Sequence, residues 1–134
     1  MPRLLRDDRV LWVLQVLLAA LYLFAGGFKL AASPESMRAS PADAVPGPEV
    51  VLFLRMIGGF EVLGALGLIL PGLTGIRPHL TSVAAGCLAF IMLGAVVISI
   101  VMMGAAAAIF PLVVGLLDVV VMLGRRGWSL RNVT

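Results

Sequence analysis

Residues Leu52–Gly72 read LFLRMIGGFEVLGALGLILPG, and their length and apolar character indicate the fold class of the chain. It matches the roughly 20 apolar residues that a helix needs to cross a bilayer. A single carboxylate, Glu61, lies near its middle, where an unpaired charge is costly. The stretch therefore predicts a membrane-spanning helix whose acid is protonated, paired or turned toward a polar interior.

The neighbours of Glu61 on the helix surface are small residues. At about 100° per residue, Gly58, Gly64 and Ala65 lie within roughly 60° of it around the helix axis. Small residues allow neighbouring helices to approach closely in membranes. We therefore expect Glu61 to face the interior of a helix bundle.

The composition extends this expectation to the whole chain. Of its 134 residues, 61% are hydrophobic and 13% are charged, which is typical of a polytopic membrane protein. We expect one all-α integral membrane domain over residues 1–134, folded as a four-transmembrane-helix bundle. The apolar runs predict helices at about residues 10–30, 50–70, 80–103 and 105–123.

The connections between these helices differ in length. Residues 31–49 are rich in proline and predict a long loop, with a short helical turn near Pro34–Met37, that covers the outer mouth of the bundle. The Pro71–Gly72 pair predicts the end of the second helix. Pro111 predicts a kink in the fourth.

The basic residues indicate the orientation in the membrane. Most lie before the first helix, between the second and third, or after the fourth. The positive-inside rule then places both termini in the cytoplasm and the loop of residues 31–49 outside. Because these residues flank spans rather than form one patch, we expect the lipid bilayer as a partner and no nucleic acid.

Polar residues recur on the first helix. Gln15, Tyr22 and Lys29 are spaced seven apart, which places them along one face. Two interpretations are open. Lys29 reaches the far interface while the other two bond to neighbouring helices, or the three border an internal polar cavity.

Two acids and two bases lie within the predicted membrane region. Glu61 and Asp118 are expected at similar depths, and Lys29 and Arg55 toward the outer side. They either hold helices together as ion pairs and shared protons or form a polar site for a small ligand. Lys29 is favoured over Arg55 as the partner of Glu61, because Arg55 is about 120° round the same helix.

Residues that occur only once exclude several kinds of site. The one cysteine, Cys87, excludes an internal disulfide and a CxxC redox pair. The one histidine, His79, has no second His and no Cys near it, so we expect no metal site. The sequence also lacks a nucleophile–base pair and a Gly-rich nucleotide loop, so we expect no catalytic residues and no autonomous catalysis.

Several stretches together resemble the DoxX-like membrane proteins, over nearly the whole chain. The resemblance rests on FAGGFKL at Phe24–Leu30, an Arg-x-x-Gly-x-x-Glu segment with its flanks at Leu54–Gly72, Met92–Ala95 and Gly124–Arg125. It implies a four-helix protein of the bacterial cytoplasmic (inner) membrane. It also implies an association with redox complexes, because the family's name comes from members associated with quinol oxidase and thiosulfate:quinone oxidoreductase.

Only some of the candidate residues match the sequence pattern of that family. Lys29, Arg55 and Glu61 match its pattern, whereas Asp118 is not part of it. Many relatives carry a histidine in the third helix near the position of Ser99 here. A redox or metal role that depends on this histidine is therefore not expected.

The sequence leaves two classes of function. The first is an accessory or ligand-binding subunit that holds a quinone-like or lipid-like molecule near the buried acids, beside a membrane redox complex or within a homo-oligomer. The alternative is a small proton-coupled transporter or carrier that uses Glu61 and Asp118. The candidate site residues, for either class, are Gln15, Tyr22, Lys29, Arg55, Glu61, Ser99 and Asp118.

Overall fold

The computed structural model describes residues 7–37, 44–75, 77 and 79–125, and within these ranges every regular element is helical. The elements are α1 (Asp8–Ala31), the 3-10 turn η2 (Pro34–Met37), α2 (Pro48–Thr74), α3 (Leu80–Met103), the 3-10 turn η3 (Ala105–Ala108) and α4 (Ile109–Arg125). Within the described residues, four helical segments are long and apolar enough to cross a membrane, when η3 and α4 are taken together. For this part of the chain, the prediction of an all-α fold with four such segments is confirmed.

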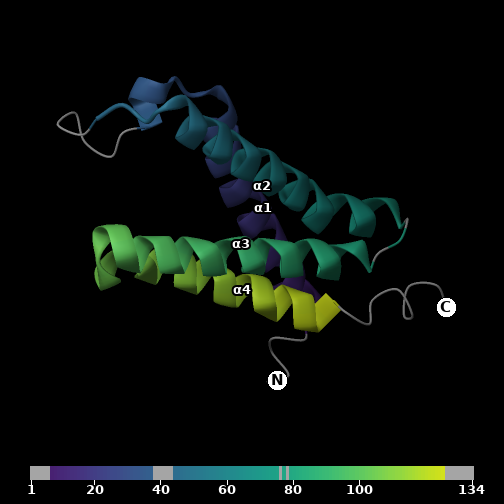
Figure 1. Ribbon diagram of the computed structural model, residues 1–134. Coiled ribbons are helices and arrows are strands. Elements are labelled where there is room, and N and C mark those ends of the chain that lie inside the picture. The colour runs from purple at the N-terminus through teal and green to yellow at the C-terminus, as the bar shows by residue number, and fades with distance from the viewer. Residues whose placement is uncertain (1–6, 38–43, 76, 78, 126–134) are drawn as a thin grey trace.

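The four helices form two hairpins that pack against each other. α1 pairs with α2, and α3 pairs with α4; α2 also packs on α3, with a smaller contact between α1 and α4. Figure 1 shows the α1–α2 connection and the α3–α4 turn at one end of the molecule. The α2–α3 connection lies at the other end.

The bounds of α1 and α2 follow from local chemistry. The side chain of Asp7 accepts a hydrogen bond from the backbone N–H of Arg9, at 2.9 Å, which caps the first turn of α1. α2 begins with Pro48, where the missing N–H costs nothing, and Glu49 suits the positive end of the helix. The predicted turn at Pro34–Met37 is present as η2.

The second helix is longer than the sequence predicted. The Pro71–Gly72 pair does not end α2, which continues to Thr74. Pro71 removes only one backbone donor, and its own carbonyl accepts the N–H of Gly75 at 3.0 Å. Gly75 ends the helix with φ 71°, a left-handed conformation that suits glycine.

The fourth apolar segment, predicted as one helix over residues 105–123, consists of a 3-10 turn followed by an α-helix. Residues 105–108 form η3, and α4 starts at Ile109, after a turn at Gly104 with φ 98°. Pro111 therefore lies in the first turn of α4 rather than in its interior. Proline is tolerated there because the first-turn N–H groups have no partner within the helix.

A close crossing of α1 and α2 positions the polar residues. A Cβ on Gly26 would lie 2.6 Å from the carbonyl oxygen of Gly58, and a Cβ on Gly58 would lie 2.8 Å from the Cβ of Lys29. Only glycine allows the two backbones this distance. The crossing brings Lys29 onto the same level as Glu61.

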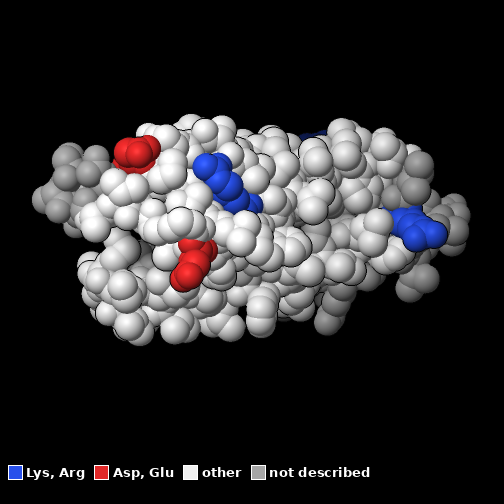
Figure 2. Space-filling view, turned by 45° about the horizontal axis from the view of Figure 1, so that its top comes forward, with Lys and Arg blue, Asp and Glu red and all other residues white. Residues whose placement is uncertain are grey.

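The outer faces of the helices are apolar. Large side chains such as Phe24, Phe90 and Val101 are about three-quarters exposed. On the face in Figure 2, Lys, Arg, Asp and Glu appear only at a few separate places. This surface suits lipid, because charged groups are excluded from the hydrocarbon region.

Candidate functional site

Lys29 and Glu61 form an ion pair between α1 and α2. The Lys29 Nζ lies 2.8 Å from the Glu61 Oε1. The Glu61 side chain is 2% exposed and that of Lys29 is 27% exposed, so the ammonium reaches inward to a buried carboxylate. The interaction compensates an acid that would be costly alone in the membrane. The preferred pairing of Lys29 with Glu61 is confirmed.

Arg55, the alternative partner of Glu61 in the sequence-based prediction, instead bonds to the backbone at the end of α1. Its guanidinium donates to the carbonyl oxygens of Leu30, of Lys29 at 3.3 Å and of Ala32 at 3.2 Å. Lys29 and Leu30 belong to the last turn of α1 and Ala32 is the residue after it, so these carbonyls have no partner within the helix. Arg55 therefore caps α1 from α2, and the alternative pair with Glu61 is not formed.

Tyr22 and Asp118 connect α1 with α4 in the core. The Tyr22 hydroxyl donates to the Asp118 Oδ2, and both side chains are fully buried. The Asp118 Oδ1 has no hydrogen-bond partner among the described residues. Asp118 thus pairs with a phenol and not with either of the two bases named from the sequence.

A cavity of about 300 Å³ lies between the two hairpins and brings four of the predicted residues together. Its polar lining consists of Tyr22, Lys29, Glu61 and Ser99, which come from α1, α2 and α3. The remaining lining is apolar: Leu21, Ala25, Met92, Ala95, Met103, Ala107, Phe110, Pro111 and Val114. The seven-residue line on α1 therefore borders this partly open cavity at two of its three positions, Tyr22 and Lys29.

The described part of the long connection does not line this cavity. Residues 32–37 and 44–47 are absent from its walls. Residues 38–43 lie outside the described residues, so the prediction that the loop covers the outer mouth stays a prediction.

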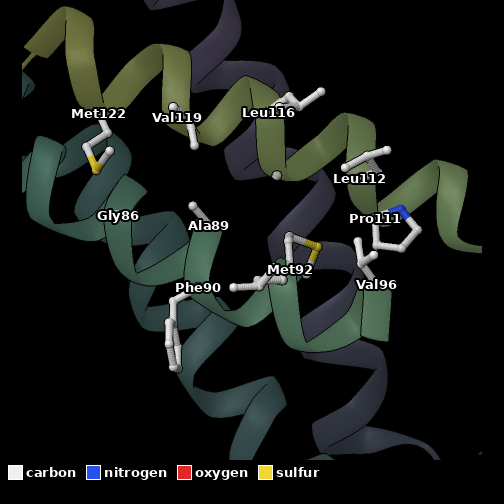
Figure 3. Close-up of a pocket in the computed structure, with 12 residues that line it drawn as sticks. Gly86, Ala89, Phe90, Met92, Val96, Pro111, Leu112, Leu116, Val119 and Met122 are labelled. Atoms are coloured by element: carbon white, nitrogen blue, oxygen red, sulfur yellow. The ribbon is translucent and has the colours of Figure 1, made fainter. Parts of the chain in front are cut away.

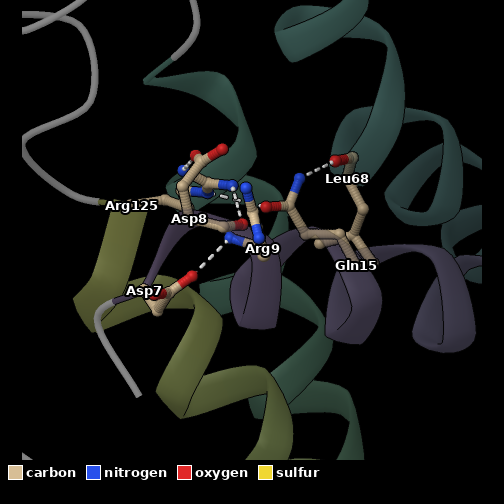
Figure 4. Close-up of polar contacts among 6 residues, drawn as sticks. All are labelled: Asp7, Asp8, Arg9, Gln15, Leu68 and Arg125. Carbon is tan, nitrogen blue, oxygen red and sulfur yellow. Dashed lines mark hydrogen bonds and ion pairs between the residues drawn. The ribbon is translucent and has the colours of Figure 1, made fainter. Parts of the chain in front are cut away.

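Gln15 belongs to a separate polar cluster near the start of α1. It donates to the carbonyl oxygen of Leu68 at 2.6 Å and accepts from the Arg125 Nε at 2.7 Å (Figure 4). Arg125 also pairs with the Asp8 carboxylate at 2.7 Å and lies over the ring of Trp12. The cluster ties the end of α4 to the start of α1 and to α2.

Sequence reasoning missed the burial of Arg125, which is 3% exposed. By its position in the sequence, Arg125 belongs to the basic residues after the fourth helix, which are expected to flank a span. The available signal was that Arg125 lies seven residues after Asp118 and so shares its face on a helix.

Two further hollows lie between helices and are apolar. One, of about 380 Å³, lies along the contact between α3 and α4, and Ala89, Met92, Val96 and Met122 are among the residues that line it (Figure 3). The other, of about 810 Å³, follows α2 and α3 and includes the exposed Cys87. No group of three His, Cys, Asp or Glu side chains able to hold a metal occurs in the described part of the chain.

Comparison with known proteins identifies the family. The model of the DoxX-like family matches residues 13–121, which include all seven candidate residues. No curated protein and no solved structure matches the chain. Together with four apolar helices, the match indicates a multi-pass membrane protein. The chain belongs to the DoxX-like family.

Proposed function

We propose that this protein is a ligand-binding accessory subunit that holds the polar head of a quinone-like or lipid-like molecule in the cavity between its hairpins. The observation that carries the proposal is the Lys29–Glu61 ion pair on the cavity wall. A mostly apolar pocket with a few placed polar groups is the usual form of a small-molecule site.

The polar groups favour a ligand that accepts hydrogen bonds. One Lys29 N–H serves Glu61, and an ammonium has three donors. Ser99 adds a hydroxyl on the opposite helix, α3. A ring carbonyl, as in a quinone, or an ester carbonyl of a lipid would suit these donors.

The size of the cavity favours a head group with a protruding tail. About 300 Å³ is at the lower limit for small-molecule sites. Met103 and Phe110 line one side and are more than 60% exposed. An apolar tail would leave between these residues and enter the bilayer.

The cellular setting is part of the proposal. The protein lies in a bacterial cytoplasmic membrane with both termini in the cytoplasm, so the cavity is entered from the outer side. It has no catalysis of its own and works beside a membrane redox complex or as a homo-oligomer. Pull-down from native membranes, followed by mass spectrometry of proteins and extracted lipids, tests these partners.

The binding site is tested with a short-chain ubiquinone analogue and purified protein in detergent. Lys29→Met should raise the Kd by about tenfold or more, because a hydrogen bond from a charged donor is lost. Glu61→Gln should also weaken binding while the protein still inserts. Glu49→Gln, on the exposed first turn of the same helix, is the control. Unchanged affinity in both cavity variants, with normal folding, would refute the site.

A second function, a proton-coupled carrier, has one supporting observation. Tyr22 borders the cavity and bonds to Asp118, so a second carboxyl adjoins the cavity through a hydroxyl. Flux into proteoliposomes with and without a pH gradient distinguishes a carrier from a binding subunit. Flux that follows the gradient and is lost in Glu61→Gln would favour the carrier.

A further inference from the structure

The α2–α3 groove, the hollow of about 810 Å³ described above, is separate from the polar cavity. Its lining side chains are apolar, with Cys87 among them. Its floor is closed where Gly67 meets Ala84 and where Gly64 meets Leu88. Phe60 and Phe90 also line it and are more than half exposed. The groove is therefore open to the surface that suits lipid and sealed from the interior.

The length of the groove corresponds to one leaflet of a bilayer. On α3 its lining runs from Leu80 to Ile91. Eleven residue steps in a helix cover about 16 Å. Half of a hydrocarbon core of roughly 30 Å is about 15 Å. An acyl chain that starts at the interface would end near the middle of the membrane.

A cation without an acidic neighbour in the sequence lies at the interfacial end. Arg77 is the only Asp, Glu, Lys or Arg between Glu61 and Asp118. It is exposed in the α2–α3 connection, and its carbonyl oxygen accepts the N–H of Leu80 at 2.9 Å. This bond holds the Arg77 backbone directly over the first groove residue of α3.

We propose that the α2–α3 groove binds one anionic phospholipid, with an acyl chain along the groove and the phosphate at Arg77. The charge is complementary, because guanidinium groups bind phosphate well. A second copy of this chain is a less suitable occupant of the groove than a phospholipid. In a dimer with its two-fold axis along the membrane normal, the same patch faces itself, so two Arg77 residues would meet at one level.

Native mass spectrometry of the detergent-purified chain with added phosphatidylglycerol or phosphatidylcholine tests this proposal. We expect one phosphatidylglycerol to bind per chain, in preference to phosphatidylcholine. Arg77→Gln should weaken its binding by about fivefold, as expected for one interfacial basic residue. Arg77→Lys should retain most of it. Cys87→Trp should fill the groove and reduce the binding of both lipids.

Two matched variants separate the groove from general effects. Arg9→Gln removes an exposed positive charge from α1, and Val16→Trp adds an indole to its exposed face; neither should alter lipid binding. Equal binding of the two lipids, or an equal effect of Arg9→Gln and Arg77→Gln, would overturn the proposal. So would a dimer lost in Cys87→Trp, which would assign the groove to a second copy. If Cys87→Trp fails to fold, the Arg77 variants still test whether the groove binds an anionic phospholipid.

Discussion

The two side chains of the Lys29–Glu61 ion pair are buried to different extents. The carboxylate is enclosed on α2, whereas the lysine keeps about a quarter of its side chain exposed. A buried ion pair need not stabilise a protein more than apolar residues of similar volume. Its position on the cavity wall is the reason that we connect it with ligand binding.

A double-mutant cycle measures the coupling of this pair. Lys29→Met and Glu61→Gln should each lower the melting temperature in detergent, and the double variant should lose less than their sum. The expected interaction energy is about 0.5–3 kcal/mol, as for residues in contact. Strictly additive losses would show that the side chains do not interact.

Asp118 should tolerate replacement by its amide. Asp118→Asn retains an acceptor for the Tyr22 hydroxyl and should fold and bind ligand within about twofold of the wild type. Asp118→Leu leaves that buried hydroxyl without an acceptor and should cost about 1–3 kcal/mol of stability. Normal melting with lost binding in Asp118→Asn would make Asp118 a ligand-binding residue.

Arg125 should contribute to stability and not to ligand binding. Arg125→Gln removes its bonds to Gln15 and Asp8, and the unsatisfied oxygen of Gln15 should cost about 1–3 kcal/mol. Thermal unfolding in detergent measures the loss, with Arg9→Gln as the exposed control. A variant that melts normally would mean that the cluster does not hold the helix ends together.

At the scale of elements, the crossing of α1 and α2 depends on two adjacent glycines in different surroundings. A methyl group at Gly26 would lie 2.6 Å from a carbonyl oxygen of α2, whereas one at Gly27 would point into open space. Gly26→Ala should therefore destabilise by about 1–3 kcal/mol through overpacking. Gly27→Ala should be neutral or stabilise by about 0.5–1 kcal/mol, since alanine favours helices.

The same pair of variants reports on the site. Because the crossing places Lys29 beside Glu61, Gly26→Ala should weaken binding of the quinone analogue and Gly27→Ala should not. Equal melting temperatures and affinities for the two variants would contradict the role assigned to the crossing.

At the scale of the whole molecule, the orientation can be tested by labelling. In a Cys87→Ser background, an impermeant maleimide added to intact cells should label Ser36→Cys in η2 and not Arg9→Cys. Ser40, in the loop predicted to lie outside, and Ser129, after the fourth helix, would serve as equivalent labelling positions, but both lie outside the described residues. Labelling of Arg9→Cys alone would reverse the topology.

The number and approximate extent of the helices could be predicted from the sequence, because the hydrocarbon thickness sets how many consecutive apolar residues a span requires. It also indicated the inward faces, since Gln15, Tyr22 and Lys29 recur with a helical period and small residues surround Glu61. The end of α2 was predicted too early, because proline removes only one hydrogen bond and a helix can continue past it.

The Lys29–Glu61 pair was predicted, but the Tyr22–Asp118 and Gln15–Arg125 contacts are seen only once the helices are packed together. Tyr22 and Asp118 are 96 residues apart, and Gln15 and Arg125 are 110 apart. Their contacts depend on the rotation and depth of helices in different hairpins, which a single helical period does not specify. The cavity has the same origin, because residues from all four helices line it and no one segment contains it.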